Sequence, residues 1–177
     1  MWQPVRRLLE LEYFLGEYLT YPLIPEDGPG RLWQSLFKGP LLLYSFGLHG
    51  LVSRQVLILT TVGRKTGSLR STPLGYTFYP ATRTYFVIAG WKGRTNWYRN
   101  ALATPTVRVR VGARKFEARA TPLSPDMIAT HLAAYAKRNP FAPGLYRRLT
   151  GINCDGTHET FLKMAPFYPG MALRQME

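Results

Sequence analysis

Two short glycine-bracketed turns hold the residues whose types and spacing are best suited to chemistry. The first, Gly63-Arg64-Lys65-Thr66-Gly67, follows an apolar run at 56–59, and Arg70 comes three residues after it. Glycine permits a tight reversal with open backbone N–H groups, and three cations surround this one. We expect the turn to bind an anionic group, phosphate above all, through main-chain amides and charge-assisted side chains. The alternative is a basic, solvated hairpin loop.

The second turn lies within 87–100, where a predicted strand ends at Ala89-Gly90. A helix begins shortly after it. The turn and the helix start carry two cations and three aromatic residues: Trp91, Lys92, Arg94, Trp97 and Tyr98. Helix N-termini bind anions, and aromatic side chains beside phosphate-binding turns suit a planar, phosphorylated cofactor better than bare phosphate. For each aromatic residue the alternative is packing in the core.

Charge is unevenly distributed along the chain, which has 177 residues and a formal net charge of +13. Between Gly28 and Phe116 there are 14 Lys or Arg residues and no Asp or Glu. This segment therefore cannot supply the carboxylate pair of a glycosidase or an oxygen-rich Mg²⁺ or Ca²⁺ site. Its positive field favours an anionic partner: nucleic acid, a lipid surface or a multiply charged small molecule.

Metal chemistry has little support elsewhere in the sequence. The three histidines and the single cysteine show no ligand spacing, so we expect no metal site. One cysteine is compatible with a reducing compartment. No segment reaches the roughly 18 apolar residues of a membrane span, and the acidic residues near the N-terminus argue against a signal peptide. We expect a cytoplasmic protein, with peripheral membrane contact through residues 1–50 as an additional possibility.

Hydrophobic periodicity predicts both strands and helices along the chain. Strands are expected near 55–62, 69–79, 84–90, 106–111, 114–123 and 171–175. Helices are expected near 5–20, 31–37, 41–51, 96–103, 125–138, 145–149 and 157–164. The strand pair at 106–111 and 114–123 alternates valine or alanine with arginine around Gly112-Ala113, which is a two-residue hairpin signal. The pattern predicts an α+β, mainly β fold, built as a small closed barrel with helices at both ends. We expect a helical segment over 1–52 and a cofactor-binding barrel with C-terminal helices over 53–177, as a single domain overall.

The motifs in order resemble the deazaflavin-dependent nitroreductase family. The matching segments are Leu59 to Leu74, Val87 to Gly93, Trp97 to Asn100 and Pro105 to Val109, so the resemblance covers about residues 52–123. It implies a split β-barrel of the FMN-binding type and the hydride carrier coenzyme F420, whose phosphate and acidic tail match a carboxylate-free basin. FMN on the same barrel is the alternative cofactor.

The resemblance also assigns residues. The implied cofactor-binding residues are Arg64, Lys65, Thr66, Gly67, Arg70, Pro73, Leu74, Ala89, Gly90, Trp91, Lys92, Trp97 and Tyr98. Tyr76 and Tyr98 are the candidates for orienting a hydride acceptor. Three departures leave the substrate open. Trp91 stands where members often have Ser, the turn before Trp97 is shorter, and Gly75 stands where some members have a substrate-side Tyr.

The leading hypothesis is an oxidoreductase that passes hydride from reduced F420 to an organic acceptor, such as a quinone, nitroaromatic or enone. The cofactor carries the hydride, so the protein needs no strong acid or base. The expected partners are this acceptor and a second copy of the chain in a homodimer. Two alternatives remain open: an F420 carrier without turnover, and a basic nucleic-acid-binding protein, although no known nucleic-acid motif is present.

Overall fold

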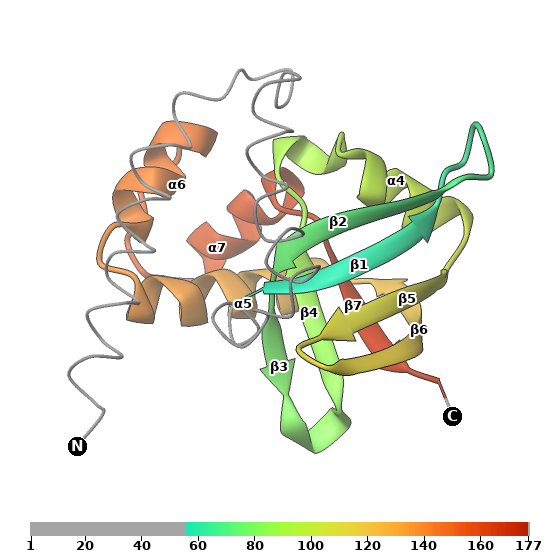
Figure 1. Ribbon diagram of the computed structural model, residues 1–177. Coiled ribbons are helices and arrows are strands. Elements are labelled where there is room, and N and C mark those ends of the chain that lie inside the picture. Colours follow the sequence, from blue (N-terminus) through green and yellow to red (C-terminus); the bar gives the residue numbers. More distant parts are fainter. Residues whose placement is uncertain (1–55, 177) are drawn as a thin grey trace. The chain divides into compact units, whose positions relative to one another are not determined.

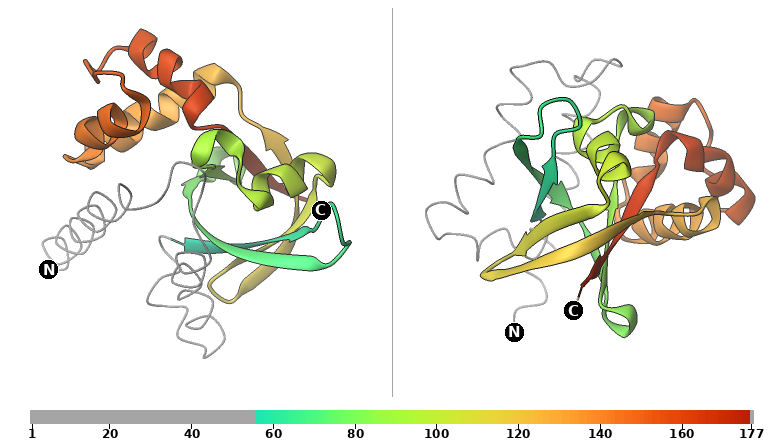
Figure 2. Two further views of the ribbon diagram at one scale, coloured as in Figure 1. Left: turned by 90° about the horizontal axis from the view of Figure 1, so that it is seen from above. Right: turned by 90° about the vertical axis from the view of Figure 1, so that its right-hand side faces the viewer.

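The computed structural model describes residues 56–176 (Figures 1 and 2). The strands are β1 (Val56–Val62), β2 (Leu69–Gly75), β3 (Thr77–Tyr79), β4 (Thr84–Ile88), β5 (Thr106–Val111), β6 (Arg114–Pro122) and β7 (Gly170–Gln175). The helices are α4 (Asn96–Ala103), α5 (Pro125–Arg138), α6 (Ala142–Thr150) and α7 (His158–Met164), with short 3₁₀ turns η3 (Pro80–Thr82), η4 (Trp91–Gly93) and η5 (Ala165–Phe167). The expected N-terminal helices at 5–20, 31–37 and 41–51 lie outside the described residues.

The described chain forms two compact units, one of residues 56–123 and 168–176 and one of residues 124–167. The first holds all seven described strands in a single antiparallel sheet, in the order β2-β1-β5-β6-β7-β4-β3. The sheet curls around an interior instead of lying flat (Figures 1 and 2). Helix α4 packs against β1 and β6. The expected α+β, mainly β fold of the split-barrel type is confirmed.

The two edges of the sheet are joined by a single residue, Tyr76. Strand β2 pairs with β1, whereas β3 pairs with β4 at the opposite edge. The expected single strand at 69–79 is therefore wrong, because the chain changes edge after Gly75. The expected closed barrel is also corrected, since no hydrogen-bonded ladder joins β2 to β3 among the described strands. The two edge strands are instead connected through the backbone at Tyr76.

Alternation along the strands builds the interior of this unit, as period-2 patterning requires. The buried cluster takes residues from five strands, from the position after β4 and from α4: Leu57, Leu59, Tyr85, Val87, Ala89, Trp97, Ala101, Val107, Val109, Ala118, Ala120, Met171 and Leu173. Leu59 is fully buried, so its replacement by Ala should cost roughly 2–5 kcal/mol of unfolding free energy. This packed interior fixes the strand ends from which the turns project.

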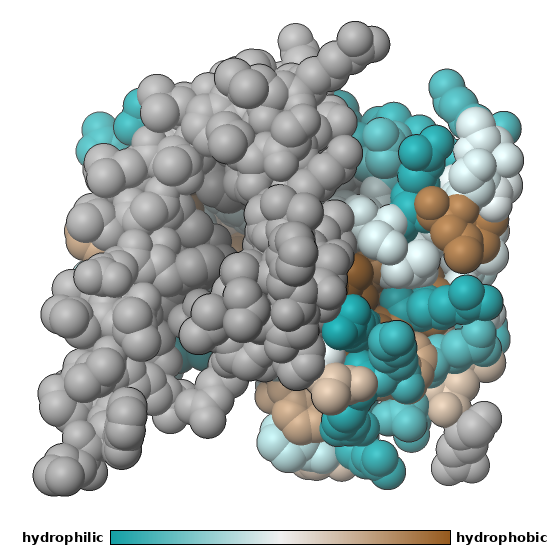
Figure 3. Space-filling view, in the orientation of Figure 1, coloured by the Kyte–Doolittle hydropathy of each residue, from teal (hydrophilic) through white to brown (hydrophobic). Residues whose placement is uncertain are grey.

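The β5–β6 hairpin follows the sequence pattern closely. Val111 pairs with Arg114 across Gly112-Ala113, and Gly112 has the positive φ of 59° that such a turn needs. Arg108 faces Glu117 at 3.6 Å on the exposed side, where an ion pair stabilises little. Hydrophilic side chains cover the face over β5 and β6 (Figure 3).

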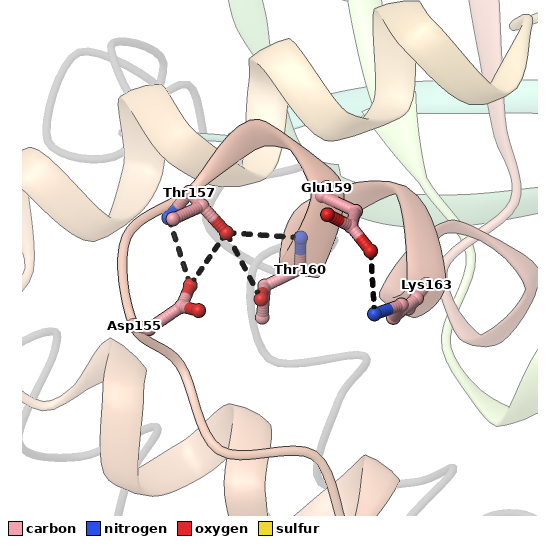
Figure 4. Close-up of polar contacts among 5 residues, drawn as sticks. All are labelled: Asp155, Thr157, Glu159, Thr160 and Lys163. Atoms are coloured by element: carbon pink, nitrogen blue, oxygen red, sulfur yellow. Dashed lines mark hydrogen bonds and ion pairs between the residues drawn. The ribbon is translucent and has the colours of Figure 1, made fainter.

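The second unit is helical, and side-chain caps mark the starts of α5 and α7, whereas α6 begins after Phe141 without one. Ser124 Oγ accepts a hydrogen bond from the Met127 N–H at the start of α5, with Pro125 in the first turn. Thr157 caps α7 by accepting from the Thr160 N–H, and the Asp155 carboxylate accepts from the Thr157 N–H at 2.9 Å (Figure 4). These backbone and hydroxyl donors lower the pKa of Asp155 to about 2. No helix in the described residues is long and apolar enough to span a bilayer.

Candidate functional site

The first glycine turn connects β1 to β2 and is closed by its own backbone. Gly63 N–H donates to Ser68 O at 2.8 Å, and Gly67 N–H donates to Gly63 O at 2.7 Å. A Cβ on Gly63 would lie 3.1 Å from both Ser68 O and Thr66 Oγ1, and Gly67 has a φ of +68°. The close backbone approach at Gly63 and the positive φ at Gly67 therefore both favour glycine. The turn projects past the end of the sheet (Figure 1).

Arg64 is held by two asparagines of α4. Its Nη1 donates to Asn96 Oδ1 at 3.2 Å and to Asn100 Oδ1 at 3.0 Å. Its backbone N–H also donates to Asn100 Oδ1, at 3.2 Å. Asn100 is itself buried, and its Nδ2 donates to Thr61 Oγ1 on β1 at 3.2 Å. The two predicted turns therefore belong to one site, because α4 begins three residues after the second turn and contacts the first.

Among residues 56–176, nothing neutralises the positive charge of the first turn. Arg64, Lys65 and Arg70 are all exposed. The described ion pairs join Arg108 to Glu117, His158 to Asp126 and Lys163 to Glu159, so none of them neutralises a cation of this turn. A turn with several cations and no carboxylate attracts anionic ligands.

The second turn, η4, is strained. Lys92 has a φ of 53° and a ψ of 37°, a left-handed conformation that costs a residue with a Cβ roughly 1–2 kcal/mol. Gly93 follows with a φ of +72°, and a Cβ there would lie 2.9 Å from Pro169 Cγ and 3.2 Å from Tyr98 Cε1. Left-handed residues of this kind concentrate at ligand-binding turns. The backbone at Trp91–Gly93 is therefore fixed by its neighbours.

Helix α4 carries the predicted aromatic pair in two different environments. Trp97 is 6% exposed and belongs to the buried cluster, so its ring serves packing. Tyr98 is half-buried, and burial raises the pKa of its phenol, which stays protonated at neutral pH. Thr95 occupies the N-cap without a side-chain cap, and its buried Oγ1 has no hydrogen-bond partner in the described structure. A buried hydroxyl without a partner calls for an explanation, and a bound water or ligand group is one.

Residues predicted to line the ring fall into two groups. Leu74, Tyr76 and Tyr98 pack against the buried cluster while remaining partly exposed, so each retains surface for a ligand. Pro73 is also partly exposed. Ala89 is fully buried, and its N–H donates to Pro169 O at 2.7 Å, so neither its side chain nor its N–H is open to a ligand.

Three polar residues of the site carried no predicted role: Thr61, Asn96 and Asn100. The available signal was a polar residue on the buried face of an otherwise amphipathic helix, since Asn100 lies one turn after Trp97 and beside Ala101. A buried amide must be hydrogen-bonded, but the sequence does not name its partners. Among the described residues, no group of three or more His, Cys, Asp or Glu side chains could hold a metal ion.

The curled antiparallel sheet is of the split-barrel type, and its two glycine turns meet at helix α4. The chain matches the family described as F420H(2)-dependent quinone reductase over residues 47–150, which is more than half of its length. The protein belongs to this family, and coenzyme F420 is its cofactor. The family assignment makes it an F420-dependent reductase.

Solved structures with a similar fold share little sequence with this chain. One, described as an F420-H2 dependent reductase (FDR-A), is 20% identical with a TM-score of 0.49, covering 68% of this chain and 95% of that one. A protein of unknown function from Agrobacterium tumefaciens is 22% identical with a TM-score of 0.49, covering 72% of this chain and 53% of that one. Neither likeness transfers a substrate to this chain.

The residues present fit F420. Its phosphate and acidic tail need cations and open donors, and the first turn offers uncompensated cations beside α4. Gly67 leaves open space at its Cβ position, with nothing within 4 Å. The orphaned Thr95 Oγ1 adds a hydrogen-bonding group at the start of α4. Half-buried aromatic and apolar side chains supply surface for a planar ring.

Proposed function

We propose that the protein reduces a quinone-type acceptor with reduced F420. The observation that carries the proposal is the family match over residues 47–150, supported by a cationic turn that is fixed to helix α4. When bound, the reduced cofactor supplies a hydride, and hydride plus one proton converts a quinone to a hydroquinone. Nitroaromatic and enone acceptors are the alternatives within the same two-electron chemistry.

The protein contributes binding and orientation to this reaction. Arg64, Lys65 and Arg70 hold the anionic part of the cofactor, while Lys92 places a further cation in the second turn. Tyr98 keeps its proton at neutral pH, so its Oη donates a hydrogen bond to an acceptor oxygen. Tyr76 is the second candidate for this role. Holding the acceptor within roughly 3–3.5 Å of the ring accounts for most of the catalysis we assign to the protein.

A cofactor titration followed by turnover tests the proposal. The protein is titrated with oxidised F420 and, separately, with FMN, and fluorescence quenching gives both dissociation constants. Reduced F420 is then mixed with protein and a short-chain benzoquinone, and the absorbance of oxidised cofactor is followed. We expect F420 to bind more tightly than FMN, and the rate to exceed that of the protein-free mixture.

Each rival has its own result. Tighter binding of FMN than of F420 points to the flavin alternative. Tight F420 binding without any acceptor-dependent oxidation, tested with quinone, nitroaromatic and enone, indicates a carrier. Binding of a defined DNA or RNA sequence that survives high salt, with no cofactor binding, supports the nucleic-acid alternative.

A further inference from the structure

We propose that Asn96 and Asn100 are positioning residues that direct one edge of the Arg64 guanidinium, its Nε and Nη2, to a two-oxygen anion of the cofactor. This proposal rests on the proposed function, in which Arg64 anchors the anionic part of F420. It adds how Arg64 is held and which chemical group it meets: a phosphate or carboxylate bound bidentately.

Some N–H groups of the Arg64 guanidinium already have protein acceptors among the described residues, and the others do not. A guanidinium has five N–H donors, two of them on Nη1. Nη1 is hydrogen-bonded to Asn96 Oδ1 at 3.2 Å and to Asn100 Oδ1 at 3.0 Å. The remaining three, on Nε and Nη2, have no protein partner in the described structure. Nε and Nη2 form the fork that matches two oxygens of a carboxylate or phosphate.

Both holding groups are neutral amides, and this choice preserves the charge of Arg64. An aspartate at either position would accept the same hydrogen bonds but would neutralise the cation. The orientation of the Asn100 amide is set by its partners, since Oδ1 receives two N–H groups and Nδ2 faces Thr61 Oγ1. The amides thus fix the Arg64 side chain while leaving its full positive charge available to an anion.

The two asparagines that hold Arg64, here called the clamp, are supported by rigid elements. Asn100 lies in the middle of α4 and is 3% exposed, and Thr61 lies on β1 and is 1% exposed. A long arginine side chain otherwise loses rotamer freedom when it binds a ligand. Because the amides order it beforehand, less entropy is lost when the anion arrives.

The change Asn100→Asp separates positioning from packing. A carboxylate still accepts from both Arg64 groups, and the Thr61 hydroxyl reverses to donate, so the fold keeps every hydrogen bond. The thermal midpoint should change little, because pairing with Arg64 offsets the desolvation of the buried carboxylate, while F420 affinity falls about tenfold as Arg64 loses its net charge. Asn96→Asp, at an exposed position, places the same charge beside Nη1 and should act in the same direction.

Gln175→Glu is the matched control. Gln175 Oε1 accepts from Arg114 Nη2 at 3.4 Å on β7, so the change makes the same amide-to-acid replacement beside an arginine outside both turns. F420 affinity should not change in this variant. Equal loss of affinity in Asn100→Asp and Gln175→Glu would reduce the effect to net charge and overturn the proposal.

Two further readouts distinguish the possible failures. The ring of F420 without phosphate and tail should bind wild type and Asn100→Asp equally; equal losses for ring and whole cofactor, with a lower thermal midpoint, would mean a purely structural role. Inorganic pyrophosphate serves as a probe that contains no deazaflavin. The Arg64 Nε–H resonance is assigned as the arginine signal that disappears in Arg64→Lys. Pyrophosphate should shift this signal in wild type but not in Asn100→Asp. If wild type shows this shift but does not bind F420, the proposed function fails and the clamp stands. If F420 binds wild type and Asn100→Asp equally, the clamp fails and the proposed function stands.

Discussion

Asn100 Oδ1 lies 3.0 Å from Arg64 Nη1 and 3.2 Å from the Arg64 backbone nitrogen, so one buried amide fixes both the main chain and the side chain of the first turn. The two residues are 36 positions apart in sequence. Their contact joins the β1–β2 turn to the helix that leads out of the second turn. The predictions below follow from this joined site and from the backbone that supports it.

Removing the cations of the first turn should weaken cofactor binding without unfolding the protein. Arg64, Lys65 and Arg70 are exposed, so their joint replacement by Ala removes little packing. Each charge-assisted hydrogen bond contributes roughly 1.5–3 kcal/mol, and we expect at least about a hundredfold loss of F420 affinity. Fluorescence titration at several salt concentrations measures this, and the salt dependence should become shallower.

The control for this prediction removes the same charge from the strands. Arg108, Arg119 and Arg174 are exposed on β5, β6 and β7, and their joint replacement by Ala should leave affinity within about twofold. Similar losses in both triple variants would show that the general positive field, not the first turn, binds the cofactor.

Much of this site follows from sequence because its turns are local. Gly63, Gly67 and Gly93 mark reversals whose geometry depends on neighbouring residues. Local signals also fix α5, which begins at Pro125 after the Ser124 cap and ends at Arg138 before Asn139-Pro140, as expected. The β5–β6 hairpin was likewise predictable from alternation around Gly112.

The rest depends on partners distant in sequence. The strand pattern at 69–79 is continuous, and only pairing with β1 and β4 shows that the chain changes edge at Tyr76. From sequence, Trp97 could pack in the core or contact a ligand, and the structure places it in the buried cluster. The homodimer, the division at residue 52, the cytoplasmic location and membrane contact through residues 1–50 stay predictions.

Replacing Lys92 by glycine should raise the stability of the protein and weaken its binding of F420. Its φ of 53° costs roughly 1–2 kcal/mol for a residue with a Cβ, so Lys92→Gly should raise the unfolding free energy by about 1 kcal/mol. The lost cation should weaken F420 binding. Arg83 has a φ of 49° at the end of η3, and Arg83→Gly should give the same stability gain without the affinity loss. Urea unfolding and cofactor titration measure both, and parallel affinity losses would remove Lys92 from the site.

Gly93 should be less tolerant of a methyl group than Gly67. Both have positive φ, +72° and +68°, so Ala at either position pays the same backbone cost of roughly 1 kcal/mol. At Gly93 the new Cβ would also meet Pro169 Cγ at 2.9 Å and the Tyr98 ring at 3.2 Å, whereas at Gly67 it meets nothing within 4 Å. Gly93→Ala should therefore show the lower thermal midpoint of the two. Equal midpoints would mean that Pro169 and Tyr98 move aside without cost.

His131 should make stability depend on pH. Burial, together with the nearby positive charge of Arg138, lowers the pKa of His131 from 6.5 to about 4, and its buried Nδ1 has no hydrogen-bond partner among the described residues. Between these two values the unfolded chain binds the proton and the folded chain does not. The free energy of unfolding therefore falls as pH drops from about 6.5 towards 4, by on the order of 2 kcal/mol.

Replacing the imidazole isolates this contribution. His131→Gln removes the titrating group, so urea unfolding at about pH 7 and about pH 4.5 should show a smaller loss of stability than in wild type. Asp155 does not interfere in this window, because the Thr157 donors lower its pKa to about 2 and it stays ionised. The difference between the two pH values matters here, not the absolute stability, since Gln also changes packing at this position. Identical pH slopes in both proteins would show that His131 takes up its proton without unfolding, through access to water that its buried position argues against.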